Sequence, residues 1–372
     1  MKDLHGILFA YHSDGNLGDL TLSRNTCSLP FGGRYRLIDF MLSNYVNAGI
    51  SDVGVIVHQN YQSLLDHLGS GKDWDLSRKH GGLRILPPSG YSMNQCRNDY
   101  KGNVDALSGV TGYLKKIRQN YVIMGWGDVA VNLPVDEIFQ QHLASGADIT
   151  VVCSANKKGS PNFSNYVELD ADGRICDLTV HPSSAGDSLE SLETYILSKD
   201  LLLKLVDSCA SHNVYSFSRG VLQARMNDLK IMPYIHNGYV ARFQDVKDYF
   251  SGSMELLDAD VRKDLFCADR PIRTKDRSNP STYYGSDVVT KNALVADGCY
   301  IEGDVENSIL SRGVIVEKGA KVSNCVLMQG TVVKAGANLS CVITDKNVQI
   351  CENRTLTGHE TYPITVKKDT IL

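Results

Sequence analysis

The sequence predicts an α/β domain built on a mostly parallel sheet, followed by a smaller parallel β-solenoid. Up to about residue 255, short β-like runs alternate with segments of helical spacing, which is typical of a sheet covered by helices on both faces. From about Tyr283, apolar residues recur about every six positions with Gly or Asn at the corners, which is typical of a solenoid. The expected boundaries are 1–257 for the α/β domain, 258–282 for a charged linker and 283–372 for the solenoid.

The elements of the first domain follow in chain order from these patterns. Apolar runs predict strands over Leu4–Tyr11, Asp52–His58, Tyr121–Trp126 and Asp148–Cys153. Helical spacing predicts helices over Arg36–Ala48, Tyr61–Leu68, Asn103–Ile117 and Pro134–Ala144. In sheets of this kind, ligands bind at the carboxyl ends of the strands. The loops that follow the strands are therefore the places to search for a site.

An internal repeat of 17 residues supports the solenoid. The segments Leu310–Val326 and Leu327–Ile343 match at the pairs Leu310/Leu327, Gly313/Gly330, Val316/Val333, Gly319/Gly336, Ala320/Ala337 and Ser323/Ser340. The segment Thr344–Glu360 continues the register weakly, with Asn347, Ile350 and Asn353 in three of these columns. A β-sandwich is the alternative, but its strands would not repeat Gly-Ala at one fixed offset. The repeat predicts three short strands per turn, in a domain that commonly serves in assembly.

The composition excludes several other classes of protein. The 372 residues are 42% hydrophobic and 22% charged with a net charge of −4, so nothing indicates binding to nucleic acid or an anionic membrane. No apolar run approaches the roughly 20 residues of a membrane span, and Met1–Gly15 favours a buried strand over a signal peptide. The ten cysteines form no CxxC or CxxxC pair, which favours free thiols in a reducing compartment over a zinc site. We expect a cytoplasmic protein.

Four motifs, in this order, resemble those of one enzyme family. They are Leu29–Phe40 (LPFGGRYRLIDF), Gly71–Arg78 (GKDWDLSR), Tyr100–Leu107 (YKGNVDAL) and Gly125–Asp128 (GWGD). With the solenoid, they resemble the ADP-glucose pyrophosphorylases, also called glucose-1-phosphate adenylyltransferases, over nearly the whole chain. The resemblance implies a Rossmann-like nucleotidyltransferase domain followed by a C-terminal left-handed parallel β-helix. It also implies a Mg²⁺-dependent reaction of ATP with glucose 1-phosphate that yields ADP-glucose and pyrophosphate for glycogen or starch.

The phosphate-binding loop of that family is degraded in this chain. The family has the segment A-G-G-x-G-T-R after its first strand, whereas this chain has Tyr11, His12 and Asp14 in place of the three glycines. Glycine lets the backbone approach phosphate closely; Tyr and His side chains obstruct that approach, and an aspartate adds a like charge. By resemblance, the catalytic arginine of the family falls on Asn16 and the lysine of its A-K-P motif on Thr26. Two positive charges beside the triphosphate are therefore lost.

Other family positions are retained or only partly changed. By resemblance, Asp128 and Asp245 stand where the family coordinates Mg²⁺, although Asp245 precedes a predicted helix and could instead be its N-cap. We expect that Mg²⁺, if it binds at these vestigial positions, is not used productively. Gly102, Asp105 and Gly127 stand in segments that the resemblance assigns to nucleotide or substrate binding.

Two further residues stand at positions with a role in the family. His181 replaces the lysine that grips the sugar phosphate, and an exposed turn histidine without that role is the alternative. Arg24 is retained, and by resemblance it lies near the domain interface where sugar-phosphate effectors act. A surface salt bridge is the equal alternative for Arg24.

The loss of several phosphate-handling residues predicts a regulatory subunit with little or no activity of its own. The resemblance implies a heterotetramer with a catalytic ADP-glucose pyrophosphorylase subunit, whose kinetics or effector response this chain modulates. One alternative is an active adenylyltransferase with a remodelled loop that uses Asp128 and Asp245 with Mg²⁺. Another is a sugar-phosphate or sugar-nucleotide sensor without turnover. A sugar acyltransferase is a remote alternative, because the repeats carry no catalytic histidine at a turn.

Overall fold

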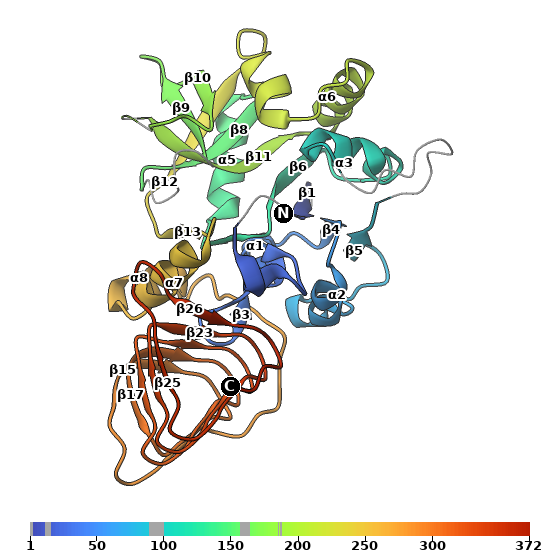
Figure 1. The fold of residues 1–372 in the computed structure, drawn as a ribbon. Helices are drawn as coiled ribbons and strands as arrows, with labels where there is room; N and C mark the ends of the chain where they lie inside the picture. The colour runs from blue at the N-terminus through green and yellow to red at the C-terminus, as the bar shows by residue number, and fades with distance from the viewer. Residues whose placement is uncertain (1–2, 12–15, 89–99, 157–163, 185, 187) are drawn as a thin grey trace.

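The computed structural model describes residues 3–11, 16–88, 100–156, 164–184, 186 and 188–372. An α/β domain is followed by a β-helix, and the two lie one above the other in Figure 1. The predicted architecture, an α/β domain followed by a C-terminal parallel β-helix, is confirmed. Among the described residues, no helix has the length and apolar character that a membrane span requires.

A nine-stranded sheet forms the centre of the α/β domain. Its strands are β1 (Leu4–Ala10), β4 (Asp52–Val57), β5 (Gly82–Leu86), β6 (Tyr121–Trp126), β8 (Ile149–Ser154), β9 (Asn165–Leu169), β10 (Ile175–Val180), β11 (Leu189–Ser198) and β12 (Ile231–His236). They run in the order β10-β9-β11-β6-β1-β4-β5, with β8 paired to β11 and β12. Two short pairs flank the sheet, β2 (Pro30–Phe31) with β3 (Tyr35–Arg36) and β7 (Val129–Val131) with β13 (Val240–Arg242). All four predicted strands are confirmed to within one residue at each end.

The prediction of a mostly parallel sheet is wrong for half of it. Strands β5, β4, β1 and β6 are mutually parallel, as predicted. Strand β11, however, runs antiparallel to β6, β8 and β9, and β10 runs antiparallel to β9. The physical reason is the connection between strands. No described helix separates β8, β9, β10 and β11, and strands joined without a crossover helix pair antiparallel.

Two groups of helices flank the sheet (Figure 1). The α-helices are α1 (Leu37–Asn47), α2 (Gln62–Leu68), α3 (Asn103–Gly109), α4 (Thr111–Leu114), α5 (Val135–Ser145), α6 (Lys199–Ser211), α7 (Val246–Glu255) and α8 (Ala259–Leu265). Helix α1 packs against β1 and α5, while α3 packs against α6. The helix predicted over Asn103–Ile117 is divided at Val110 into α3 and α4. The other three predicted helices are confirmed.

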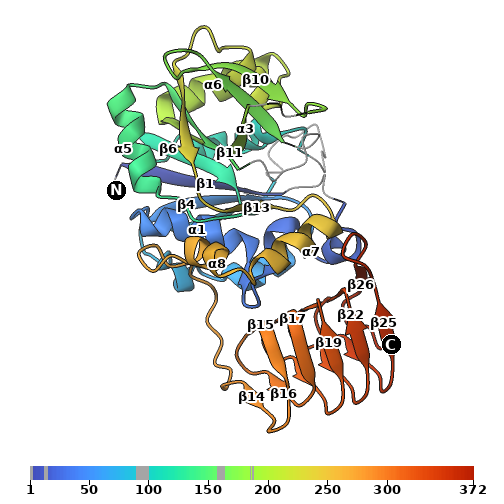
Figure 2. The ribbon, with the colours of Figure 1, turned by 90° about the vertical axis from the view of Figure 1, so that its left-hand side faces the viewer.

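The β-helix has three strands per turn, as predicted. One face consists of β14 (Tyr283–Tyr284), β16 (Tyr300–Ile301), β18 (Ile315–Val316), β21 (Val332–Val333) and β24 (Gln349–Ile350). The other two consist of β15 (Thr290–Val295), β17 (Asp304–Leu310), β19 (Lys321–Ser323), β20 (Val326–Leu327), β22 (Asn338–Ser340), β23 (Val342–Thr344), β25 (Thr355–Thr357) and β26 (Ile364–Val366). All the pairings are parallel, and the strands stack side by side in Figure 2.

The 17-residue register is confirmed residue by residue. Val316 pairs with Val333, which in turn pairs with Ile350, and Leu310 pairs with Leu327. The glycine columns lie at corners in the left-handed backbone region, with φ of 67° at Gly313 and 72° at the equivalent position one turn later. Glycine adopts this conformation at little cost, which explains the repeat of Gly in these columns.

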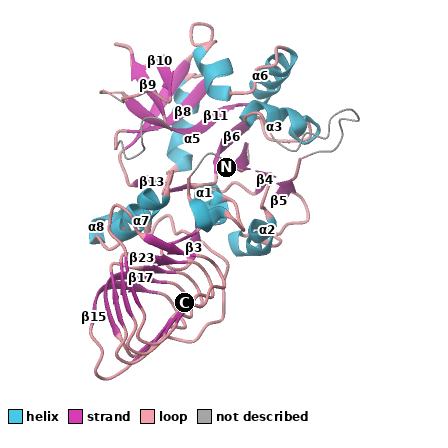
Figure 3. Ribbon diagram, in the orientation of Figure 1, coloured by secondary structure: helices cyan, strands magenta, loops and turns pink. Residues whose placement is uncertain are grey.

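An apolar core joins the β-helix to the α/β domain. Ile309, Val326, Met328 and Ile343 of the β-helix belong to the same buried cluster as residues from the β2–β3 hairpin, α1, α7 and α8. Helix α8 occupies the first part of the segment expected to be a linker. The remainder, 267–282, contains no helix or strand and runs from α8 down to β14 (Figures 2 and 3). The two domains are therefore packed together rather than loosely tethered.

Candidate functional site

A cleft of about 670 Å³ opens at the carboxyl ends of β1, β4 and β6. Tyr11 directly follows β1, His58 directly follows β4 and Trp126 is the last residue of β6, and all three line the cleft. Parallel strands bring their carboxyl ends to one edge of the sheet, so residues far apart in sequence meet there. This is the edge where the sequence predicts a ligand site.

An aromatic cluster occupies this edge of the sheet. The ring centroid of Tyr11 lies 5.0 Å from Tyr100, 5.3 Å from Trp126 and 6.3 Å from His58. Burial raises the pKa of the Tyr11 hydroxyl well above its usual value, and Tyr100, Asp105 and Glu193 add to the effect. The phenol is therefore neutral at physiological pH. The obstruction that the sequence predicts at Tyr11 is thus part of a packed cluster of rings.

An ion-pair network lies beside this cluster. Nη2 of Arg242, at the end of β13, lies 3.1 Å from Oε2 of Glu193 and 3.8 Å from Oδ1 of Asp128. The Arg242 side chain is only 8% exposed. Burial lowers the Arg242 pKa, but the surrounding carboxylates outweigh that effect and raise the pKa above its usual value. A permanent positive charge therefore sits beside Asp128.

Groups of the chain itself engage the two predicted metal positions. The guanidinium of Arg242 lies 3.8 Å from Asp128 and 3.1 Å from Glu193, so it competes with a divalent cation for these carboxylates. The Asp245 carboxylate accepts a hydrogen bond of 2.8 Å from the backbone N–H of Asp248, which makes it the N-cap of α7. The capping alternative for Asp245 is therefore confirmed. In addition, the described residues contain no group of three His, Cys, Asp or Glu arranged to hold a metal ion.

Four of the predicted site residues line the cleft: Arg24, Thr26, Gly102 and His181. His181 is exposed, with a left-handed φ of 53° and its backbone N–H bonded to the carbonyl of Ser164. A Cβ at Gly102 would lie 2.4 Å from the carbonyl oxygen of Tyr215. Close packing alone therefore requires glycine at position 102.

The other predicted residues lie around the cleft rather than in it. Asn16 is exposed and donates its backbone N–H to the carbonyl of Gln244, next to Asp245. Asp105 accepts the backbone N–H of Lys101 near the start of α3. Gly127 is buried, and a Cβ there would lie 3.3 Å from Cys27 and Ile38, so packing explains this glycine. His12 and Asp14 lie outside the described residues.

Arg24 forms a buried ion pair between the domains rather than a surface salt bridge. Its Nη2 lies 2.8 Å from both carboxylate oxygens of Asp345, which follows β23 in the β-helix. Both side chains are 2% exposed. Arg24 also lines the cleft. The ion pair therefore connects the wall of the cleft to the β-helix.

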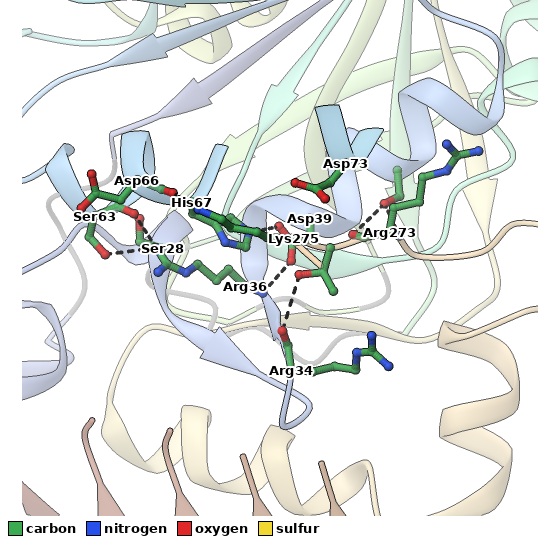
Figure 4. A network of polar contacts seen from close by, with 12 residues as sticks. Ser28, Arg34, Arg36, Asp39, Ser63, Asp66, His67, Asp73, Arg273 and Lys275 are labelled. Atoms are coloured by element: carbon green, nitrogen blue, oxygen red, sulfur yellow. Dashed lines mark hydrogen bonds and ion pairs between the residues drawn. The ribbon is translucent and has the colours of Figure 1, made fainter. Parts of the chain in front are cut away.

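A narrow pocket of about 40 Å³ lies close by, between the β2–β3 hairpin, the segment after α8 and the β-helix. Its basic side chains are Arg34, Arg36, Lys275, Arg277, Arg312 and Lys346. Figure 4 shows the α/β-domain side of this pocket, where Nε2 of His67 lies 2.6 Å from Asp39 beside Arg36 and Lys275. The concentration of positive charge at this junction favours an anion.

Lys346 shows how strong the positive potential of this pocket is. Burial lowers the pKa of Lys346 to about 7, and repulsion from Arg36, Arg24 and Arg277 adds to the shift against the opposing effect of Asp345. Part of the Lys346 population is therefore neutral near pH 7. An anion in the pocket would favour the protonated form.

Comparison with known proteins agrees with this architecture. The nucleotidyl transferase family matches residues 15–244, and the GlmU-like C-terminal hexapeptide family matches residues 281–361. Glycogen biosynthesis protein GlgD of Bacillus subtilis (strain 168) is 37% identical over 353 residues, which are 95% of this chain and 92% of that protein. GlgD of Geobacillus stearothermophilus is 36% identical over 311 residues, covering 82% of this chain and 79% of that protein.

The glucose-1-phosphate adenylyltransferase of Thermosipho melanesiensis is 30% identical over 321 residues, which cover 86% of this chain and 77% of that enzyme. The chain belongs to the ADP-glucose pyrophosphorylase family. The resemblance seen in its motifs is thus confirmed. At the two positions that the resemblance assigns to metal, a guanidinium lies beside Asp128 and the N-terminus of α7 engages Asp245.

Sequence reasoning missed several residues of this ADP-glucose pyrophosphorylase site. His58 and Trp126 end predicted strands, so the rule that ligands bind at carboxyl ends of strands could have identified them. Glu193 and Arg242 gave no comparable signal. Each is a charged residue on a strand that matches no motif, and only the fold brings them together.

Proposed function

We propose that this chain is a regulatory subunit of glucose-1-phosphate adenylyltransferase in glycogen biosynthesis, with little or no activity alone. The observation that carries the proposal is the Arg242 guanidinium beside Asp128 and Glu193. The guanidinium lies beside Asp128, which by resemblance stands where the family coordinates Mg²⁺. We therefore expect no productive use of Mg²⁺ there. The aromatic cluster around Tyr11 blocks the triphosphate path on the other side.

The proposal includes a catalytic partner subunit of the same family and a cytoplasmic location. Two relatives bear the name glycogen biosynthesis protein, and others bear the name of the enzyme, which supports a shared pathway. The Arg24–Asp345 ion pair supports a modulating role, because it ties the β-helix, the expected assembly domain, to the wall of the cleft. A heterotetramer follows from this assembly by analogy with the family.

The first expected result is an activity that depends on the partner. Pyrophosphate release from ATP and glucose 1-phosphate with Mg²⁺ should be negligible for this chain alone, because two phosphate-binding cations are lost and Arg242 engages Asp128. A complex with the catalytic subunit should differ from that subunit alone in rate, substrate affinity or effector response. Robust turnover by the isolated chain would contradict the proposal and favour the active adenylyltransferase.

The basic pocket between the domains supports effector binding as part of this function. We propose that Arg24 and the pocket beside it couple an anionic effector to the cleft, because Arg24 contacts both Asp345 and the cleft wall. A coupling free energy of about 1–3 kcal/mol is typical of such linkage. A sensor without turnover would use the same pocket but would need no partner subunit.

Anion binding in this pocket should weaken as pH rises through about 7. Lys346, with a pKa near 7, loses its proton over this range, so binding of an anion is coupled to proton uptake. The affinity for sulfate, which does not titrate here, should fall by up to about tenfold per pH unit above pH 7. Calorimetry in buffers of different ionisation enthalpy measures the proton uptake directly.

Lys346→Arg serves as the matched control, since a guanidinium keeps its charge across this range. The variant should bind sulfate with the same affinity at pH 7 and pH 9. An unchanged pH dependence in this variant would show that another group controls the binding.

A further inference from the structure

A second cleft, of about 340 Å³, lies at the opposite edge of the sheet from the family site. It is formed by the amino ends of β1 and β4, by the loop before β5 and β5 itself, and by α4 with the loop that follows it. None of its lining residues belongs to the aromatic cluster, to the Arg242 network or to the pocket between the domains. Nothing in the family assignment explains this cleft.

The rim of this second cleft is strongly basic. Lys79, Arg84, Lys116 and Arg118 line it and are exposed, and Asp52 is its one acidic lining residue. In the described part of the chain, none of these four cations has a salt-bridge partner within 4.0 Å. The whole chain carries a net charge of −4. A local excess of positive charge on an acidic protein attracts a negatively charged ligand.

The floor of the cleft is polar and incompletely hydrogen-bonded. Nε2 of the fully buried His5 lies 2.9 Å from the hydroxyl of Tyr113. Nδ1 of His5 lies 3.7 Å from Oδ2 of Asp52, and the Gln119 amide lies beside both side chains. Nδ1 of His5, Oδ1 of Asp52 and Oε1 of Gln119 are buried and make no well-aligned hydrogen bond in the described structure. Buried polar atoms are nearly always paired, so a ligand or water that reaches the floor can complete its hydrogen bonds.

The floor also differs from the rim in charge. Burial lowers the pKa of His5 to about 4, against a smaller opposing effect of the Gln119 amide. The imidazole is therefore neutral at pH 7 and can donate to or accept from a hydroxyl group. When ionised, the Asp52 carboxylate accepts hydrogen bonds and donates none, which suits a hydroxyl and repels a phosphate.

We propose that this second cleft binds a sugar monophosphate, with the phosphate on the basic rim and the sugar hydroxyls on the His5–Asp52 floor. Arg84 and Arg118 supply the planar donors that suit a phosphate, and Lys79 and Lys116 add charge. Inorganic phosphate can contact only the basic rim, and a neutral sugar can hydrogen-bond only to the polar floor. A sugar monophosphate can contact both within a cleft of this volume.

The proposal is independent of the regulatory role proposed above, because it concerns another edge of the sheet. Isothermal titration calorimetry of the whole chain with glucose 6-phosphate, inorganic phosphate and glucose tests it. We expect saturable binding of glucose 6-phosphate, weaker binding of phosphate and no detectable binding of glucose. Raising the salt concentration should weaken binding, because the rim is exposed to solvent.

Four variants locate the site. Arg84→Gln/Arg118→Gln should weaken glucose 6-phosphate binding by about tenfold or more, since two charge-assisted contacts are lost at exposed positions that do not support the fold. Lys318→Gln/Lys321→Gln, at exposed positions of the β-helix, is the matched control and should leave this binding unchanged. Arg34→Gln/Arg277→Gln tests whether the ligand binds in the pocket between the domains instead. Asp52→Asn should reduce the preference for glucose 6-phosphate over phosphate while phosphate still binds.

Any of three outcomes would overturn the proposal. The first is the absence of saturable glucose 6-phosphate binding at millimolar concentration. The second is an equal loss of binding in the two double-arginine variants, which would place the ligand between the domains. The third is binding of a long polyphosphate chain without binding of glucose 6-phosphate, which would indicate a polymeric anion.

Discussion

Replacing Arg24 with alanine is expected to destabilise the protein by about 3–5 kcal/mol, because the substitution leaves Asp345 buried without its partner. Both carboxylate oxygens of Asp345 accept from Arg24 at 2.8 Å, and both side chains are 2% exposed. An unpaired charge at this depth cannot be solvated without opening the contact between the domains. Urea unfolding of the wild type and of Arg24→Ala measures the loss.

The control variants separate the charge from the packing. Arg24→Met/Asp345→Leu removes both charges and should recover most of the stability, since well-packed apolar residues often replace a buried ion pair at little cost. Glu306→Gln breaks the exposed Lys291 pair in the same β-helix and should have no measurable effect. A loss of less than about 1 kcal/mol in Arg24→Ala would mean that water reaches Asp345 and that the ion pair does not hold the domains together.

The β-helix could be predicted almost completely from the sequence, because its structure is encoded locally. Each turn places Val316, Val333 and Ile350 in one column, and the backbone at a corner requires Gly or Asn in a left-handed conformation. The 17-residue period therefore identifies both the residues that pair between successive turns and the residues at the corners. Neither requires information about contacts between distant parts of the sequence.

The mixed half of the sheet could not be predicted in the same way. The run that forms β11 looks like any buried strand, and its direction depends on the connections on both sides. The central position of β11, between β6 and β8, is a property of the whole chain. Local patterns give the strands but not their order.

The site shows the same division between local and long-range information. The loss of the glycine loop was visible at Tyr11, and the cap at Asp245 was visible from the helix that follows. The partner of Asp128 was not visible, because Arg242 lies more than a hundred residues away on β13. The reason that this aspartate does not suit Mg²⁺ therefore comes from the fold and not from the phosphate loop alone.

Restoring the phosphate loop alone is expected to leave the chain inactive. The loop variant carries Tyr11→Gly, His12→Gly, Asp14→Gly, Asn16→Arg and Thr26→Lys. It returns glycine and two cations to the family pattern, but Arg242 still repels a divalent cation from Asp128. Pyrophosphate release with Mg²⁺ should stay at the level of the parent chain.

Adding Arg242→Gln to the loop variant should raise the rate by at least about a hundredfold over the loop variant, because one transition-state cation is typically worth 10²–10³ in rate. Glutamine keeps a polar side chain beside Glu193 and Asp128 but removes the positive charge, so a divalent cation can take its place. Arg242→Gln in the parent chain is the matched control and should remain inactive, because the aromatic cluster still fills the triphosphate path. If the combined variant is as inactive as the parent, Arg242 does not block the metal, and a further change such as the one at His181 must account for the lost activity. If the loop variant alone is active, the metal binds despite the guanidinium, and the phosphate loop is then the only barrier to catalysis.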